Sequence, residues 1–273
     1  MTNPIHGQKI THSNRLEGSV VAITGAGSGN GKATALRTGR EGASLYISDI
    51  NAELLEETIG DLKSEGINAQ GGIFDAANID DAPRFVAAVK EAHGRIDVLV
   101  NNAGAVKVEP FPNVSEENWD WTMNLNLKGA FFLMQEAAKP MIDQQSGNIV
   151  NIASIAGTFG GPTSSPSYAA AKAGLVNLTT VAAAVLAQYK IRVNAIAPGI
   201  INTPFHAPVD LAIGQEQLGL APGEHINTRV GLIPLGRLGE PEDVAATVAF
   251  LASEDAAHIS GETITVAGAM RSL

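Results

Sequence analysis

Short apolar segments alternate with helical segments along almost the whole chain, and this alternation limits the possible folds more than any other feature. The apolar runs predict about seven strands, at 19–24, 43–48, 69–74, 96–101, 147–152, 191–196 and 263–266. Helical patterns lie near 30–40, 51–66, 79–92, 115–140, 166–189 and 241–252. Strands that are apolar throughout are buried on both faces, as in a parallel sheet. We therefore predict an α/β fold, a doubly wound parallel sheet with helices on both faces.

The length of the chain and the absence of an internal linker favour a single domain. Its 273 residues can enclose a sizeable core. No repeat, charge block or low-complexity stretch divides them. The expected organisation is an N-terminal arm at 1–17 and one domain at 18–273, with a long irregular excursion at about 202–236.

Composition excludes several classes of function and partner. A formal net charge of -10 argues against nucleic acid or an anionic membrane as partner. Because the chain has no cysteine, it has no disulfide, thiolate metal site or cysteine nucleophile. Its six histidines are scattered without the spacing of metal ligands, so no metal site is expected. Charged residues make up only 17%, which suggests that part of the exterior is buried against other subunits.

Neither a signal segment nor a membrane span is expected from the sequence. Residues 1–17 lack the apolar core of a secretory signal. The most apolar stretch, 169–189, is interrupted by Lys172 and Asn177, and its small residues fit a tightly packed helix better than a helix in lipid. These observations predict a cytoplasmic protein without a membrane partner.

A glycine-rich loop, TGAGSGNGKATA, follows the first predicted strand and leads into a helix. Its glycines are Gly25, Gly29 and Gly31. Glycines allow a tight turn and a close approach of the backbone to a pyrophosphate, which the N-terminus of the helix attracts. A glycine-rich turn without any ligand is the alternative, because a lone glycine pattern is weak support.

An aspartate at the end of the second strand indicates which dinucleotide would bind. Asp49 follows Gly31 by eighteen residues, and its carboxylate would accept hydrogen bonds from the adenosine ribose and repel a 2′-phosphate. Neither Ser28 nor Ile50 supplies a cation for such a phosphate, so NAD is favoured over NADP. Asp75, at the end of the third strand, could meet the adenine, although an aspartate there is more often a helix or turn cap.

Five motifs in order resemble the short-chain dehydrogenase/reductase family. They are TGAGSGNG, NNAG (101–104), NIASIAG (151–157), YAAAK (168–172) and RVNAIAPG (192–199), and GRLGEPEDVAATVAFLAS (236–253) matches as well. The similarity extends from about residue 18 to the C-terminus. It implies a Rossmann fold and a nicotinamide cofactor.

The resemblance also implies a catalytic tetrad. Tyr168 corresponds to the general acid/base and Lys172 to its activator, while Ser154 holds the substrate oxygen and Asn126 holds a water. Each residue has a structural alternative. Ser154 could cap a strand end, Asn126 could bond only the backbone, and Tyr168 with Lys172 could be an exposed pair of negligible energy.

Electrostatics supports the role of the tyrosine and lysine. Lowering the pKa of a tyrosine from about 10 to about 7 requires roughly 4 kcal/mol in favour of the phenolate. One positive charge about 5 Å away supplies roughly 3 kcal/mol at an effective dielectric constant of about 20. The i, i+4 spacing places Tyr168 and Lys172 on one helix face. Lys172 and the nicotinamide cation together therefore suffice, whereas either charge alone is marginal.

The resemblance places further residues beside the cofactor. Asn101, Asn102, Ala103 and Gly104 follow the fourth strand, with Gly104 allowing close approach. The remaining expected cofactor contacts are Asn30, Pro198, Gly199, Ile201 and Thr203, together with Tyr168 and Lys172.

Three features depart from the family pattern. Asn30 stands where the family usually has Ile or Leu. Tyr168 follows Ser154 by fourteen positions, about one more than is common, which predicts a bulged loop. The tail contains VAGAM where a DGG-like ending is usual.

The substrate is expected to be a small uncharged secondary alcohol or ketone. The segments expected to face it (155–164, the residues after Gly104, and 204–232) are mostly small or apolar. The family resemblance and the alanine-rich outer face of 166–189 predict a homotetramer. Two alternatives remain open: an NADPH-dependent 3-oxoacyl carrier-protein reductase-like enzyme, and a non-catalytic NAD-binding regulatory protein.

Overall fold

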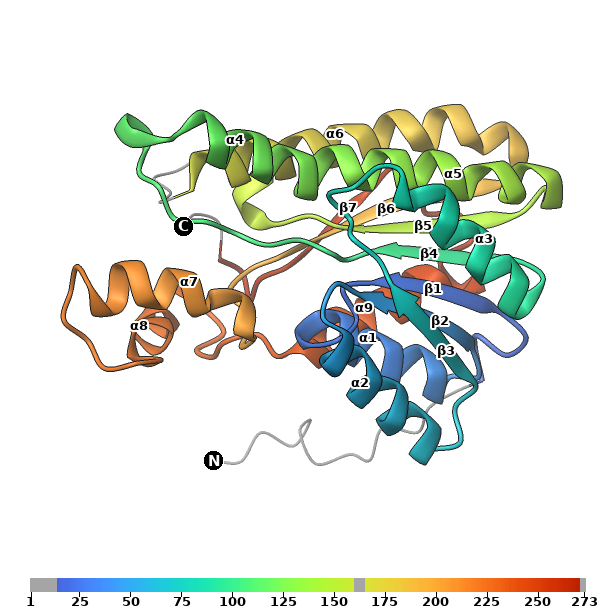
Figure 1. The fold of residues 1–273 in the computed structure, drawn as a ribbon, viewed down its shortest axis with the longest axis horizontal. Helices are drawn as coiled ribbons and strands as arrows, with labels where there is room; N and C mark the ends of the chain where they lie inside the picture. The colour runs from blue at the N-terminus through green and yellow to red at the C-terminus, as the bar shows by residue number, and fades with distance from the viewer. Residues whose placement is uncertain (1–13, 160–164, 271–273) are drawn as a thin grey trace.

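A seven-stranded parallel sheet forms the centre of the computed structural model, which describes residues 14–159 and 165–270 (Figure 1). Its order is β3-β2-β1-β4-β5-β6-β7, so β2 and β3 lie on one side of β1, and β4 to β7 lie on the other. The prediction of a doubly wound sheet is confirmed. The strands are β1 Val20–Thr24, β2 Ser44–Asp49, β3 Ala69–Ile73, β4 Val98–Asn101, β5 Gly147–Ile152, β6 Ile191–Pro198 and β7 Thr263–Val266.

Helices cover both faces of the sheet (Figure 1). Alternate residues of β1 enter two separate cores, Val21 and Ile23 on one side, Val20 and Ala22 on the other. This explains why the strand is apolar throughout. The first core is closed by α1 Gly29–Arg40, α2 Ala52–Ser64 and α9 Pro241–Ala252, the second by α3 Asp81–His93, α5 Gly129–Gln144 and α6 Pro166–Leu186.

The helix predicted at 115–140 is interrupted in the structure. It consists of α4 Glu116–Met123, a π-helical turn at Asn124–Lys128, and α5. A π-turn inserts one extra residue and shifts the side chains that follow it, and such turns occur often at functional sites. The predicted tetrad residue Asn126 lies within this turn.

The segment 202–236, expected to be irregular, contains several short helices beyond the carboxyl ends of the strands (Figure 1). The side chain of Asp210 holds two of them together, because it accepts hydrogen bonds from the backbone N–H groups of Gly223 and His225. Such contacts across a loop leave no periodic pattern in the sequence. The helices are η5 Pro204–His206, α7 Ala207–Val209, η6 Asp210–Gln215, α8 Glu224–Thr228 and η7 Arg229–Leu232.

Helix α6 has a largely exposed outer face. With the 3₁₀ turn that follows it, the stretch Pro166–Tyr189 is long and apolar enough to cross a membrane by length and composition alone, and 28% of its most apolar window is buried. No membrane span was expected from the sequence. Its inner face packs against β6, and its exposed apolar side chains include Val181 and Val185.

An ion-pair cluster connects the start of the described chain to α1. Most of the predicted N-terminal arm, residues 1–13, lies outside the described residues, but Leu16 is buried in the first core. The buried carboxylate of Glu41 contacts Arg15 at 2.8 Å and Arg37 at 2.5 Å. Burial raises the pKa of Glu41, but the hydrogen bonds from both arginines outweigh it, so the pKa lies below its ordinary value.

We predict that Glu41→Gln destabilises the protein by about 2 kcal/mol, because it leaves two partly exposed guanidinium groups without their buried partner. Because the pKa of Glu41 is lowered in the folded state, its stabilisation is complete above the unfolded pKa of about 4.3 and disappears as pH falls through the folded pKa. Urea unfolding at several pH values should therefore show a difference from wild type that shrinks in acid. Glu65→Gln, in the exposed pair with Arg40, is the control and should change stability by less than about 1 kcal/mol.

Candidate active site

A cavity of about 940 Å³ lies at the carboxyl ends of the central strands and brings most of the predicted site residues together. Three of the residues named from the sequence do not line it. Gly31 and Asn126 lie beneath its wall, and the side chain of Asn101 donates to Ala130 and Asn151 inside the fold. The predicted residues that line the cavity are Gly25, Ser28, Gly29, Asn30, Asp49, Ile50, Asp75, Asn102, Ala103, Gly104, Ser154, Tyr168, Lys172, Pro198, Gly199, Ile201 and Thr203.

The glycine loop is shaped by close backbone packing. Gly25 has a φ of 64°, a conformation that L side chains rarely adopt. A Cβ on Gly31 would lie 2.1 Å from the carbonyl oxygen of Gly25 and 2.6 Å from Nδ2 of Asn102. Asn102 in turn donates to the carbonyl oxygens of Thr24 and Gly25, at 2.9 Å each. Gly31 therefore supports the loop from below, and Asn102 fixes it to β4.

The N-terminus of α1 faces the cavity with its polar groups free for a ligand. Ser28 precedes the helix and makes no side-chain capping hydrogen bond. Oδ1 of Asn30 is buried without a hydrogen-bond partner among the described residues. Free N–H groups and the helix dipole favour an anion here. The glycine loop, the free helix end and the unpaired Asn30 amide fit the pyrophosphate of a dinucleotide.

Two aspartates lie at the β2 and β3 end of the cavity. Asp49 accepts hydrogen bonds from the backbone N–H groups of Gly27 and Asn51, at 2.9 Å each. These contacts hold its carboxylate at the cavity wall. Asp75 accepts from Ala77 at 2.9 Å, so it caps a turn and also lines the cavity.

The tyrosine and lysine of the YAAAK motif lie in the first turns of α6, on the face that lines the cavity. Nζ of Lys172 lies 5.6 Å from the centre of the Tyr168 ring and donates to the carbonyl oxygen of Ile152 at 2.8 Å. Burial lowers the pKa of Lys172 to about 8. Burial also raises the pKa of Tyr168, while a hydrogen bond with Ser154 acts in the opposite direction. The pair is therefore no exposed surface contact, and the buried setting by itself opposes ionisation of the tyrosine.

Ser154 and Asn126 each combine a structural contact with access to the tetrad. Oγ of Ser154 accepts from the N–H of Ala156 at 3.1 Å, so it caps the turn after β5 while it lines the cavity. Nδ2 of Asn126 donates to the backbone at Ala105 and Thr122. Its Oδ1 has no hydrogen-bond partner among the described residues. Oδ1 of Asn126 and Nζ of Lys172 both approach Gly104, because a Cβ added there would lie 2.7 Å from Oδ1 and 3.3 Å from Nζ.

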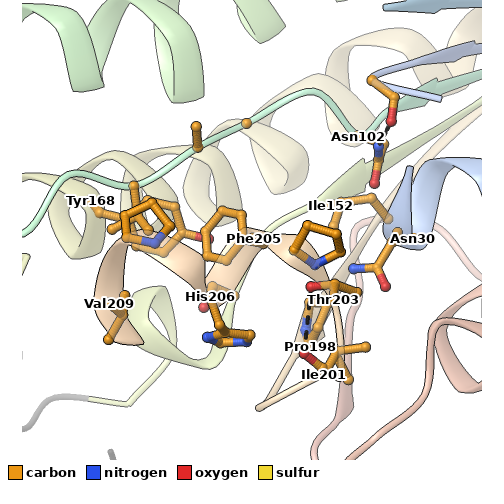
Figure 2. Close-up of a pocket in the computed structure, with 18 of the residues that line it drawn as sticks. Asn30, Asn102, Ile152, Tyr168, Pro198, Ile201, Thr203, Phe205, His206 and Val209 are labelled. Carbon is orange, nitrogen blue, oxygen red and sulfur yellow. Dashed lines mark hydrogen bonds between the residues drawn. The ribbon is translucent and has the colours of Figure 1, made fainter. Parts of the chain in front are cut away.

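The helical segment after β6 supplies side chains that the sequence did not single out. The ring of Phe205 lies close to both Tyr168 and His206, with ring centres 5.7 Å and 5.6 Å away respectively (Figure 2). The sequence indicated this segment as a whole, but its short helices have no periodicity from which the inward-facing positions could be chosen. Residues 160–164 of the predicted substrate loop, with their expected bulge, lie outside the described residues. Unpredicted lining residues include Trp121, Phe205, His206, Pro208, Val209, Asp210, Ile213, His225, Ile226 and Arg229.

Comparison with known proteins agrees with this geometry. The family model described as short chain dehydrogenase matches residues 19–213. A 3-oxoacyl-[acyl-carrier-protein] reductase of Thermotoga maritima is 40% identical over 94% of this chain and 99% of its own length. A 7alpha-hydroxysteroid dehydrogenase of Bacteroides fragilis is 36% identical over 94% and 96%.

Solved structures show the same architecture. Levodione reductase superimposes with a TM-score of 0.88 and 35% identity, covering 93% of this chain and 98% of its own. An NAD+-bound xylitol dehydrogenase gives a TM-score of 0.86 at 32% identity, over 93% and 99%. The family match, the ordered motifs and the parallel sheet agree, and the chain belongs to the short-chain dehydrogenase/reductase family of oxidoreductases.

Proposed function

We propose that this protein is an NAD-dependent oxidoreductase that interconverts a secondary alcohol and a ketone, with Tyr168 as general acid/base. The observation that carries the proposal is that Tyr168, Lys172 and Ser154 line the same cavity as Asp49 and the glycine loop. A proton-transfer group and a dinucleotide cradle thus share one cavity.

Different residues around the cavity would bind different parts of the cofactor. The Gly25 turn and the free end of α1 would receive the pyrophosphate, and Asp49 the adenosine ribose. Ala103 and Thr203 line the stretch that leads to Tyr168. The nicotinamide ring supplies a site that accepts or gives up a hydride.

The proton of the alcohol moves through Tyr168. The Ser154 hydroxyl would hold the substrate oxygen beside the phenol, and Tyr168 Oη would take the alcohol proton during oxidation and return it during reduction. The positive charge of Lys172 favours the phenolate that burial disfavours. We assign to the π-turn the role of positioning Asn126, so that its Oδ1 and Nζ of Lys172 would hold a water between them. Both atoms approach Gly104.

We predict that Tyr168→Phe lowers kcat at least about 1,000-fold while the Kd of NADH changes less than about threefold, since only the proton-transfer group is lost. The measurement is NADH oxidation with a panel of cyclic and open-chain ketones, alongside fluorescence titration of cofactor binding. Tyr189→Phe is the matched control, because Tyr189 lies at the far end of the same helix and does not line the cavity. Full turnover by Tyr168→Phe would refute the mechanism.

The preference for NAD rests on the charges at the β2 end of the cavity. The lysine and arginine that line the described cavity are Lys172 and Arg229, and both belong to other segments, so neither is placed to pair with a 2′-phosphate beside Asp49. Relatives do not decide the question. Neighbouring structures include the NAD+-bound xylitol dehydrogenase and a ketoreductase of actinorhodin polyketide synthesis with NADPH.

We predict that Asp49→Ser combined with Ile50→Arg shifts the ratio of kcat/KM for NADPH to that for NADH upward by about 100-fold. The change removes a carboxylate that repels the 2′-phosphate and adds a guanidinium that pairs with it. Ile50 is 68% exposed, so the new side chain has room. Initial rates with both cofactors test this, and a wild-type preference for NADPH would contradict the assignment of Asp49.

A 3-oxoacyl carrier-protein reductase-like activity is the second candidate, favoured by the 40% identity to the Thermotoga protein of that name. Turnover of an acyl-carrier-protein thioester with NADPH, far above that of free ketones with NADH, would select it. The non-catalytic alternative is disfavoured because Tyr168, Lys172 and Ser154 line one cavity. The cytoplasmic location stays a prediction.

We also propose that the protein is a homotetramer. The exposed face of α6, with Val181 and Val185 more than half exposed, lies beside α4 and α5, where Trp119 and Phe131 are also exposed (Figure 1). Exposed apolar side chains on neighbouring helices are typical of an oligomer contact.

We predict that Val181→Glu with Val185→Glu converts the assembly into smaller species, because four buried carboxylates at a two-fold contact cannot be solvated. Analytical ultracentrifugation at micromolar concentration measures the change. Ile73→Glu, an exposed apolar position on the edge strand β3, is the control and should leave the mass unchanged. A monomeric wild type would refute the tetramer.

A further inference from the structure

One end of the cavity holds a group of basic side chains. His206, His225 and Arg229 all line it, and all come from the helical segment between β6 and α9. Burial lowers the pKa of His206, and the charges of Arg229 and His225 lower it further. No sequence pattern groups them, since they are spread over twenty-four positions.

Two members of this group lack the hydrogen bonds that buried polar atoms normally make. Both ring nitrogens of His225 are buried without a partner among the described residues, and the residue is only 8% exposed. Nε of Arg229 is likewise buried and unpaired there. Buried polar atoms without partners destabilise a fold, and they rarely persist without a ligand or ordered water.

The one acid that lines this end, Asp210, is committed to other donors. Its carboxylate accepts hydrogen bonds from the side chain of Gln215 and from the backbone of Gly223 and His225. No described carboxylate forms an ion pair with Arg229. Burial lowers the pKa of Arg229, and no neighbouring acid counteracts it. Arg229 is thus a partly buried cation with no counter-ion among the described residues.

Apolar side chains line the cavity beside the basic group and the reacting centre. The ring of Phe205 lies close to both His206 and Tyr168 (Figure 2), and Val209, Ile213 and Ile226 also line the cavity. A ligand that reaches both ends therefore needs a polar carbon at Tyr168, an apolar chain along Phe205, and an anionic end.

We propose that the substrate is an oxo or hydroxy acid whose carboxylate binds Arg229 and His225 while its apolar chain passes Phe205 to place the carbinol carbon at Tyr168. This inference rests on the proposed function and specifies its substrate class. It replaces the uncharged substrate expected from the sequence with one that is apolar in the middle and anionic at one end.

The test compares methyl-ketone acids with their own methyl esters, using 4-oxopentanoate, 5-oxohexanoate, 6-oxoheptanoate and 7-oxooctanoate as probes. For at least one chain length, wild type should reduce the acid with a kcat/KM at least about tenfold above that of the ester. Arg229→Met should lower kcat/KM for that acid by about 10–100-fold, mainly through KM, because a hydrogen-bonded charge contact contributes about 1.5–3 kcal/mol. The ester should change by less than about threefold.

Two further variants separate recognition from folding. Arg237→Met is the matched control, since Arg237 is 44% exposed in its side chain, pairs with Asp243 and does not line the cavity. It should leave the ratio of acid to ester unchanged. Arg229→Lys keeps the charge and should recover part of the preference for the acid. Circular dichroism and NADH titration establish that each variant is folded and binds cofactor.

The outcomes distinguish this inference from the proposed function. If neutral ketones such as 2-heptanone are reduced through Tyr168 but no acid is preferred, or if Arg229→Met affects acid and ester alike, the carboxylate site is refuted and the proposed function stands. If no ketone is reduced with either cofactor, the proposed function fails, and calorimetric binding of hexanoate to the NADH-loaded protein decides the site. Binding that Arg229→Met abolishes supports it, and absent or unchanged binding overturns it.

Discussion

The site exists because the chain leaves β1 toward one face of the sheet and leaves β4 toward the other. The segment after β1 enters α1 on one face, and the segment after β4 leads to α4 and α5 on the other. Two neighbouring parallel strands that diverge in this way leave a crevice at their carboxyl ends, where ligands bind in doubly wound folds. The glycine loop, Gly104 and Ser154 all line that crevice.

Burial in this crevice gives the tetrad its electrostatic character. Desolvation raises the pKa of Tyr168 and lowers that of Lys172 to about 8, so burial opposes the charged form of each group in the protein alone. This penalty adds to the cost of forming the phenolate, and it depends on burial that the sequence does not show. The charge of Lys172 and a cationic nicotinamide therefore have more to offset than the roughly 4 kcal/mol of the simple calculation.

Structural and chemical roles overlap in this site rather than exclude each other. Ser154 and Asp75 make the capping contacts of the structural alternative and also line the cavity. Asn126 bonds the backbone through Nδ2 and keeps Oδ1 free. The tail that departs from the family pattern also contributes, because Met270 packs against Ile155, Ile200 and Ile233 beneath the cavity. In Asn126 the two roles involve different atoms of the side chain, and in Ser154 they involve the same hydroxyl, which residue type alone does not reveal.

The sequence by itself determined the seven strands, their helices, the family and most of the cofactor crevice, from Gly25 and Asp49 to Tyr168 and Lys172. Those features are local, because apolar runs, glycine spacing and i, i+4 placement express themselves within a few residues. Only the tertiary structure decided the π-turn at Asn126, the interior position of Asn101, and the meeting of His206, His225 and Arg229. These depend on contacts between distant segments, such as Asp210 holding two short helices together. No periodic pattern records them, so the chemistry of the substrate end became visible only in the folded chain.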